Sequence, residues 1–175
     1  MDSSFDRSAN SKTEWLTPPN IIQALGEFDL DPCAPIIRPW DTATQHYTVE
    51  DDGLIKEWVG RVWCNPPYGN EMGKWLQRMA QHGDGIALLF ARTDTGIFFR
   101  HIWPVASGIM FLRGRLVFHH VDGSKPTNGA GAPSCLIAYG ERNAEALRDS
   151  GLDGLFKVHF IINTARSKAS LTPAI

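Results

Sequence analysis

Residues 60–70 read GRVWCNPPYGN, a short hydrophobic run that ends in an amide, two prolines and an aromatic ring. The run is typical of a buried strand bounded by a glycine on one side and by prolines on the other. Because proline cannot donate to a β-ladder, the strand is expected to stop at Asn65. Pro66 and Pro67 then fix φ at two successive positions, which holds the nearby carbonyl groups stiffly. Ligands of open α/β sheets bind at the carboxyl ends of strands, so the sequence predicts a ligand site here.

The bulk composition is that of one globular domain. The chain has 175 residues, 43% hydrophobic and 21% charged, enough for a single core. No run approaches the roughly 18 apolar residues of a membrane span, and the polar start MDSSFDRSANSKTEW does not resemble a secretory signal. The three cysteines form no CxxC pair, which argues against zinc and against a disulfide framework. We therefore expect no metal, no membrane and a cytoplasmic location.

Charge is unevenly distributed along the chain. Residues 1–60 hold 4 Lys and Arg against 11 Asp and Glu, whereas residues 61–175 hold 13 against 8. A basic second half favours contact with a phosphate backbone, although ordinary surface variation gives the same pattern.

Hydrophobic periodicity divides the chain into alternating elements. Helices are predicted over residues 16–28, 69–83, 94–106 and 143–151, and strands over 28–34, 61–65, 85–91, 134–140 and 155–163. Residues 108–120 are predicted to form a strand or a hairpin. Residues 35–53 are expected to be irregular, and residues 121–133 to form a long glycine-rich loop, which in a compact domain is often functional.

This order of elements predicts an α/β fold. Fully apolar strands that alternate with helices favour a mostly parallel, Rossmann-like sheet with helices on both faces. The late strands without intervening helices favour an antiparallel addition near the C-terminus. We expect one domain over residues 14–164, an N-terminal tail over 1–13 and a C-terminal tail over 165–175.

The sequence NPPY suits a particular piece of chemistry. The Asn65 side chain and a proline-fixed carbonyl place two acceptors close together, which would bind the two hydrogens of an NH₂ group and leave its lone pair free. Tyr68 offers a face on which a planar group can stack. The simpler alternative is a proline-terminated strand with an aromatic lid.

NPPY resembles the catalytic motif of S-adenosylmethionine-dependent amino-methyltransferases, especially those that act on the adenine 6-amino group of DNA. Around it, EWLTPPNIIQALGEFDLDPCA, EDDGL, VWCNPPYGN, ARTDTGIFF and RGRLVF together resemble the small phage-type DNA adenine methyltransferases. The match runs from about residue 14 to about residue 140. It implies a class I methyltransferase-like fold, a phage source and S-adenosylmethionine as methyl donor.

The resemblance also implies roles for individual residues. Asn65 and the Pro66 carbonyl would accept hydrogen bonds from the adenine amine, with Pro67 completing the motif, and Tyr68 would stack on the flipped base. Cofactor contacts would come from three stretches that precede the motif. These are Thr17 and Pro18 in WLTPP, Asp31, Pro32 and Ala34 in LDPCA, and Asp52 in EDDGL. Asp51 is the alternative to Asp52, and Asp41 is a guess for the ribose. Without the motif, Thr17 reads as a helix cap and Asp31–Pro32 as a turn.

For DNA contacts, Arg113 and Arg115 are spaced to share one face of a strand, and Lys125 and Asn128 follow in the glycine-rich loop. Arginine and asparagine suit guanine and adenine edges, and lysine suits phosphates. The alternative is that these are ordinary surface residues of a hairpin.

The whole pattern predicts methyl transfer from S-adenosylmethionine to adenine in double-stranded DNA, with no obligate protein partner. Two alternatives stay open. One is the same chemistry on RNA or on a protein glutamine. The other is a DNA-binding protein that has lost catalysis, which the absence of the usual glycines after Asp31–Pro32 favours.

Overall fold

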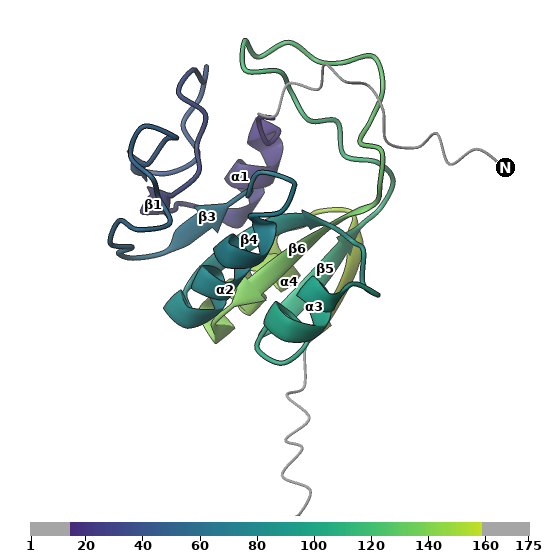
Figure 1. Cartoon of the computed structure of the whole chain (residues 1–175). Helices are drawn as coiled ribbons and strands as arrows, with labels where there is room; N and C mark the ends of the chain where they lie inside the picture. The colour runs from purple at the N-terminus through teal and green to yellow at the C-terminus, as the bar shows by residue number, and fades with distance from the viewer. Residues whose placement is uncertain (1–14, 159–175) are drawn as a thin grey trace, which may run out of the picture.

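A computed structural model describes residues 15–158. A single seven-stranded sheet, in the order β2-β1-β3-β4-β6-β5-β7, runs through this part of the chain (Figure 1). Its strands are β1 (Leu30–Asp31), β2 (Gln45–His46), β3 (Val62–Cys64), β4 (Gly85–Phe90), β5 (Gly108–Leu112), β6 (Ser134–Tyr139) and β7 (Gly154–Val158). The predicted tails, and the end of the last predicted strand, lie outside the described residues.

The sheet is mixed, and the prediction of a mostly parallel sheet was wrong. The pairings of β2 with β1, β1 with β3 and β3 with β4 are parallel. From β4 onward every pairing is antiparallel: β4 with β6, β6 with β5 and β5 with β7. The antiparallel addition was expected, but it makes up half of the strand pairings, because β6 and β7 both return beside β5 without a parallel crossover.

Helices cover both faces of the sheet, as predicted. The helices are α1 (Pro19–Leu25), α2 (Met72–His82), α3 (Gly96–His101) and α4 (Glu141–Asp149). Leu76 and Met79 of α2 and Phe98 of α3 pack with one face of the sheet, whereas Ile21 of α1 and Leu147 of α4 pack with the other. Neighbouring residues of β3 alternate between these two cores, because side chains of a strand point to opposite faces in turn. None of the helices within residues 15–158 is long and apolar enough to cross a membrane.

Three local predictions were wrong. The short strand β2 lies in a stretch expected to be irregular, and it pairs with β1 at the sheet edge. The strand or hairpin predicted over 108–120 is a strand that ends at Leu112, because Gly114 adopts a positive φ of 75° and the chain leaves the sheet. The N-cap of α1 is Pro18 and not Thr17, and no side chain caps this helix.

Arg61, the residue before β3, ties several elements together beneath the sheet. Arg61 is 5% exposed, and its guanidinium carbon lies 4.2 Å from the centre of the Phe28 ring. It donates to Asn143 Oδ1 of α4 at 2.7 Å and to the carbonyls of Leu25 and Glu27 at 2.9 and 2.8 Å. These bonds connect the end of α1, the start of β3 and α4, so Arg61 fixes the strand that carries the NPPY motif.

Replacing Arg61 by Met keeps the apolar stem but removes the donors, leaving the Asn143 oxygen and two carbonyls without their partner. We expect Arg61→Met to lower the free energy of unfolding by about 3 kcal/mol, measured by urea denaturation. The matched control is Arg148→Met, because Arg148 is exposed and bonds the neighbouring Asp149. That change should cost less than about 0.5 kcal/mol. Equal effects of the two substitutions would contradict the role given to Arg61.

Candidate active site

The carboxyl ends of the neighbouring parallel strands β1 and β3 bring Asp31 and Asn65 to one edge of the sheet. A cavity of about 480 Å³ lies there. It is lined by Trp15, Leu16, Thr17, Asp31, Pro32, Cys33, Ala34, Pro35, Thr42, Thr48, Val49, Asp52, Gly53, Trp63, Asn65, Pro66, Pro67, Tyr68 and Trp75. We call this space the main cavity. Its volume is within the usual range for pockets that bind small molecules and cofactors.

The main cavity gathers most of the residues expected at the site. All four NPPY residues line it, as do five of the six predicted cofactor residues: Thr17, Asp31, Pro32, Ala34 and Asp52. Pro18 is the exception, because it turns into α1 and lines a different cavity. The gathered residues come from segments up to about fifty positions apart in sequence, and the pairing of β1 with β3 is what joins them.

The Asn65 side chain presents a free acceptor at this site. Its Nδ2 donates to the carbonyl of Trp15 at 3.2 Å, while its Oδ1 is buried and has no hydrogen-bond partner. The bond to Trp15 fixes which end of the amide is which, because an amide nitrogen donates and an amide oxygen accepts. A buried, unpaired acceptor costs free energy, so the geometry favours a ligand that donates a hydrogen bond to Oδ1.

The segment that holds Asn65 is itself anchored on both sides. Leu16 and His119 exchange two backbone hydrogen bonds of 2.9 Å, and the Trp40 indole donates to the carbonyl of Thr17 at 3.2 Å. Leu16 and Thr17 are both almost fully buried. Residues 15–17 therefore form a wall of the main cavity, a role that the sequence indicated for Thr17 alone.

Tyr68 stacks on Phe90, the last residue of β4. The two rings are 4.3 Å apart at 19°, and the Tyr68 hydroxyl is buried without a hydrogen-bond partner. Burial raises the pKa of Tyr68, so the phenol stays neutral. Phe90 covers one face of the Tyr68 ring, while Tyr68 also lines the main cavity. Nothing in the sequence singled out Phe90, because it read as the end of an apolar core strand.

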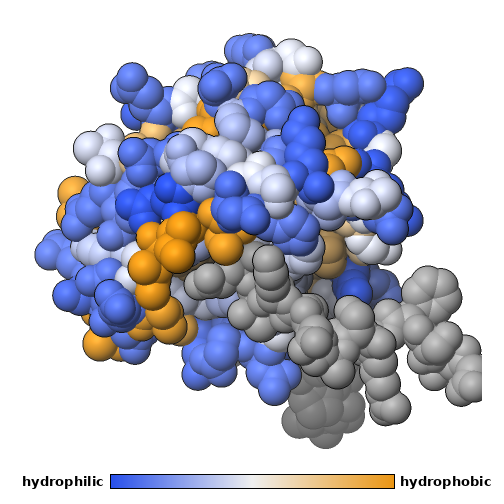
Figure 2. Space-filling view, turned by 90° about the horizontal axis from the view of Figure 1, so that it is seen from above, coloured by the Kyte–Doolittle hydropathy of each residue, from blue (hydrophilic) through white to orange (hydrophobic). Residues whose placement is uncertain are grey.

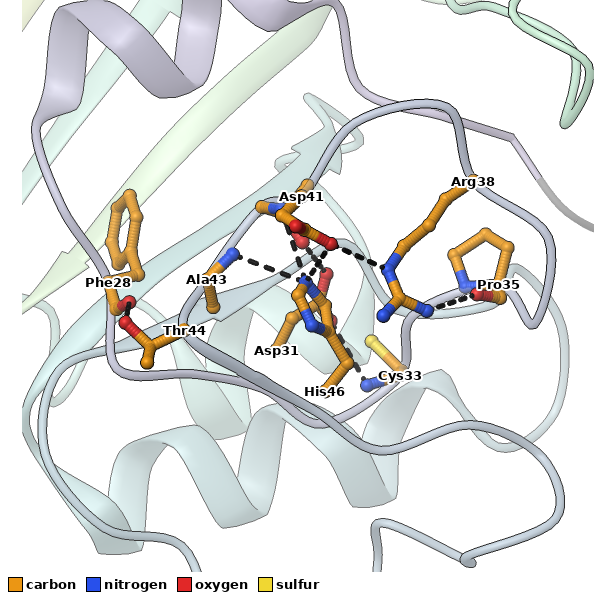
Figure 3. A network of polar contacts seen from close by, with 10 residues as sticks. Phe28, Asp31, Cys33, Pro35, Arg38, Asp41, Ala43, Thr44 and His46 are labelled. Atoms are coloured by element: carbon orange, nitrogen blue, oxygen red, sulfur yellow. Dashed lines mark hydrogen bonds and ion pairs between the residues drawn. The ribbon is translucent and has the colours of Figure 1, made fainter.

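Asp31 is a buried carboxylate in the wall of the main cavity (Figure 3). It is 3% exposed and accepts hydrogen bonds from Thr42 Oγ1 at 2.5 Å and from the backbone N–H of Cys33 at 3.1 Å. Burial raises the pKa of Asp31 to about 6, against the opposing effect of these hydrogen bonds and of the nearby Arg38. Such a group is mostly ionised at neutral pH and carries its charge at a substantial cost, which a bound cation would offset.

A second polar network surrounds Asp31 (Figure 3). Arg38 donates to Asp41 at 3.2 Å, and His46 Nε2 accepts from the backbone N–H groups of Thr42 and Ala43 at 3.2 and 3.3 Å. Burial, and then the charge of Arg38, lower the pKa of His46, in agreement with a neutral ring that accepts at Nε2. The network holds the loop that carries Thr42. Asp41 is exposed and is not one of the residues that line the main cavity, so the guess that it contacts a ribose finds no support in the described residues.

The structure separates the two candidate aspartates of EDDGL. The Asp51 carboxylate accepts from the backbone and hydroxyl of Thr48 at 2.9 and 3.1 Å, whereas Asp52 lines the main cavity. Asp52 has a positive φ of 55°, and the next residue, Gly53, packs so closely that a Cβ atom there would lie 1.9 Å from the Pro32 carbonyl oxygen. The glycine thus lets the loop pass directly against the end of β1, which puts Asp52 in the cavity wall.

The mouth of the site is partly hydrophobic. Val49 lines the main cavity although it is 77% exposed, and Ile36, Ile37 and Ile55 of the nearby loops are also exposed. Figure 2 looks down on the molecule from the top of Figure 1 and shows a hydrophobic patch within a mostly hydrophilic surface.

Cys33 and Cys64 are free thiols with sulfurs 3.8 Å apart. Residues 15–158 contain no group of three or more His, Cys, Asp and Glu that could hold a metal ion.

The predicted DNA-contacting residues lie elsewhere. Arg113, Arg115 and Lys125 line a second cavity of about 320 Å³, while Asn128 is exposed in the glycine-rich loop and lines neither of the two cavities. The two arginines do not lie on a strand, because β5 has ended before them. Arg113 pairs with Asp153 at 3.1 Å on the surface.

The raised pKa of Asp31 makes a prediction about stability. The folded state holds this proton more tightly than the unfolded state, whose pKa is near 3.8. The stability from protonated Asp31 is therefore full below about pH 4 and lost as the pH rises through 6, a change of roughly 3 kcal/mol. Urea titrations of Asp31→Asn and wild type give the difference between their free energies of unfolding. This difference should shift in favour of the variant by up to about 3 kcal/mol between pH 4 and pH 7.5. A difference that stays constant with pH would contradict this assignment.

Comparisons with known proteins bear on the same residues. A family model described as DNA N-6-adenine-methyltransferase (Dam) matches residues 6–150, a range that includes every segment lining the main cavity. Searches of curated proteins and of solved structures returned no match. A match over most of the chain, together with the gathered NPPY residues, identifies the family. The chain belongs to the DNA N-6-adenine-methyltransferase (Dam) family, which methylates adenine in DNA.

Proposed function

We propose that the protein transfers a methyl group from S-adenosylmethionine to the 6-amino group of an adenine flipped out of double-stranded DNA. One observation carries this proposal: Asn65 Oδ1 is a buried acceptor without a partner in the wall of the main cavity. An exocyclic amine donates to such an acceptor. Asn65 also follows directly after β3, next to the end of β1, where α/β sheets bind their ligands.

The residues of the main cavity fit S-adenosylmethionine, whose sulfonium supplies the methyl group when it is bound. Its amino group is a cation, and Asp31 is a buried carboxylate that needs one. Thr17, Thr42 and Asp52 offer further polar groups, and Val49 and Trp75 offer apolar surface for a planar ring. We propose that Asp31 binds the amino group and that Asp52 binds near the adenosine part. Pro32 and Ala34 would pack beside Asp31, with Pro18 contributing only through the position of Thr17.

The chain's contribution to the chemistry is to position and activate the target amine. An adenine amine is a weak nucleophile because its lone pair is delocalised into the ring. Acceptors at Asn65 Oδ1 and at the Pro66 carbonyl would draw its two hydrogens out of the ring plane and localise the lone pair. Pro66 and Pro67 hold this carbonyl stiffly, so little reorganisation is needed when the bond to the methyl group forms.

Base flipping gives Tyr68 its role in the proposal. The amine cannot be reached inside a duplex, so the adenine must leave the base stack. Tyr68 would stack on the extruded base through the ring face that Phe90 does not cover. Phe90 then supports the Tyr68 ring from behind, which lowers the entropy lost when the base binds.

The decisive experiment is methyl transfer from labelled S-adenosylmethionine to unmethylated duplex DNA, followed by nucleoside analysis. We expect label in 6-methyladenine, and a fall in kcat of about 100- to 1,000-fold in Asn65→Ala, because one fixed transition-state acceptor is lost. Cofactor affinity, measured by calorimetry, should change less than about twofold. The exposed neighbour Asn70 provides the control, and Asn70→Ala should keep wild-type activity.

Each other outcome of that assay points to a different reading. Label in RNA or in a protein glutamine, with DNA unlabelled, would move the substrate while keeping the chemistry. A protein that binds DNA, but neither binds S-adenosylmethionine nor transfers a methyl group, would favour a DNA-binding protein that has lost catalysis. The latter reading draws on residues 33–39, CAPIIRP, which follow Asp31–Pro32 and hold none of the glycines of the typical methyltransferase motif.

Two substitutions of Tyr68 separate stacking from hydrogen bonding. The Tyr68 hydroxyl has no partner, so Tyr68→Phe should retain activity within about threefold and should not lower stability. Tyr68→Ala removes the stacking surface, and DNA that carries an unpaired target adenine should bind about 10- to 100-fold more weakly. Fluorescence of 2-aminopurine at the target position reports the unstacked base. Equal loss in both variants would contradict a stacking role.

A further inference from the structure

The second cavity has features of a binding site that the proposed function does not yet use. It lies beside the start of α1, and residues from four segments line it, among them Pro18, Arg113, Arg115, His119, Lys125 and Asp153. Three of these residues are cations and one is an anion, so the lining carries a net positive charge. Its polar groups face a space of about 320 Å³.

His119 is the second, independent sign of a ligand. It is 6% exposed, lines the second cavity, and its Nδ1 is buried without a hydrogen-bond partner. The Trp40 ring packs against it edge-on, with the ring centres 5.2 Å apart. Burial, and then the charge of Lys125, lower the pKa of His119. A neutral imidazole can carry a proton at Nδ1 and donate it to an anionic oxygen.

We propose that the second cavity binds a phosphate of the DNA backbone, held by Arg115, Lys125 and His119. Arginine and lysine are the side chains that bind phosphate oxygens most strongly. Arg113 contributes less, because its guanidinium already pairs with Asp153 at 3.1 Å. This inference rests on the proposed function, since it takes DNA to be the substrate.

The position of the second cavity explains why a phosphate there would matter for catalysis. Trp15, Leu16 and Thr17 line the main cavity, and the next residue, Pro18, lines the second. His119 connects to this segment through its two backbone hydrogen bonds with Leu16. The Trp15 carbonyl in turn orients the Asn65 amide. A phosphate bound at His119 would thus be anchored to the same short segment that positions the catalytic acceptor.

The test is the salt dependence of duplex binding, measured with a short unmethylated duplex over a series of NaCl concentrations. Neutralising one phosphate contributes about 0.9 to the slope of log Kd against log salt. If Arg115 and Lys125 hold the same phosphate, the double variant Arg115→Ala/Lys125→Ala should lose about one unit of slope and not two. The matched control is Arg142→Ala, because Arg142 is exposed on α4. This helix follows the end of β6, which pairs with the start of β4.

His119 is tested separately with His119→Phe, which keeps an aromatic ring against Trp40 and the backbone bonds to Leu16. It removes a neutral hydrogen-bonding group, so duplex binding should weaken about fivefold with an unchanged salt slope. Cofactor binding should stay as in wild type for every variant. An unfolded variant would show itself by circular dichroism, and the remaining variants still decide the question.

The outcomes separate DNA from a small phosphate ligand. The melting temperature of wild type is measured in inorganic phosphate and in a chloride control of the same ionic strength. A rise that the double variant loses, without any change in its DNA slope, would show a site for a small phosphate compound and overturn the DNA assignment. If the double variant loses no more slope than Arg142→Ala, the assignment of the second cavity as a phosphate site is overturned. Failure of the proposed function would instead appear as wild-type protein that binds duplex but transfers no methyl group.

Discussion

The candidate site depends on the parallel pairing of β1 with β3. Leu30 of β1 lies in register with Val62 of β3, so the residues that follow each strand leave the sheet at the same edge. Pro66 and Pro67 end β3 there and hold Asn65 at the boundary between core and cavity. Arg61 fixes the opposite end of the same strand through three hydrogen bonds. Without this pairing the buried carboxylate of Asp31 and the free acceptor of Asn65 would have no common cavity.

Asp31 and Asn65 are among the buried groups at the site that the fold alone leaves in unfavourable states. Asp31 is a buried carboxylate, and burial raises its pKa to about 6. Asn65 Oδ1 has no hydrogen-bond partner. Proteins retain such groups where a ligand satisfies them. One needs a cation and the other needs a donor, which matches the two substrates of an amino-methyltransferase. The Dam family match indicates methylation of adenine in DNA, and these two buried groups suit that chemistry.

The segment of residues 15–17 links the parts of the molecule. It forms a wall of the main cavity, accepts the hydrogen bond that orients Asn65, and pairs with His119 of the second cavity. A single stretch of backbone therefore connects the Asn65 amide to a cluster of cations. The helix α1 that follows packs its Ile21 and Leu25 into the core, which keeps this wall rigid.

The sequence by itself determined the α/β class and the strand that carries NPPY, because hydrophobic periodicity and proline chemistry depend on neighbouring residues. It also indicated ten candidate catalytic and cofactor residues, nine of which line the main cavity. It could not determine the mixed sheet or the edge strand β2, since strand pairing depends on residues far apart in the chain. Phe90 behind Tyr68, the Trp15 carbonyl that orients Asn65, and the placement of Pro18 beside the basic residues were equally hidden. In each of these cases only the tertiary structure decided, because the contact joins segments that no local pattern connects.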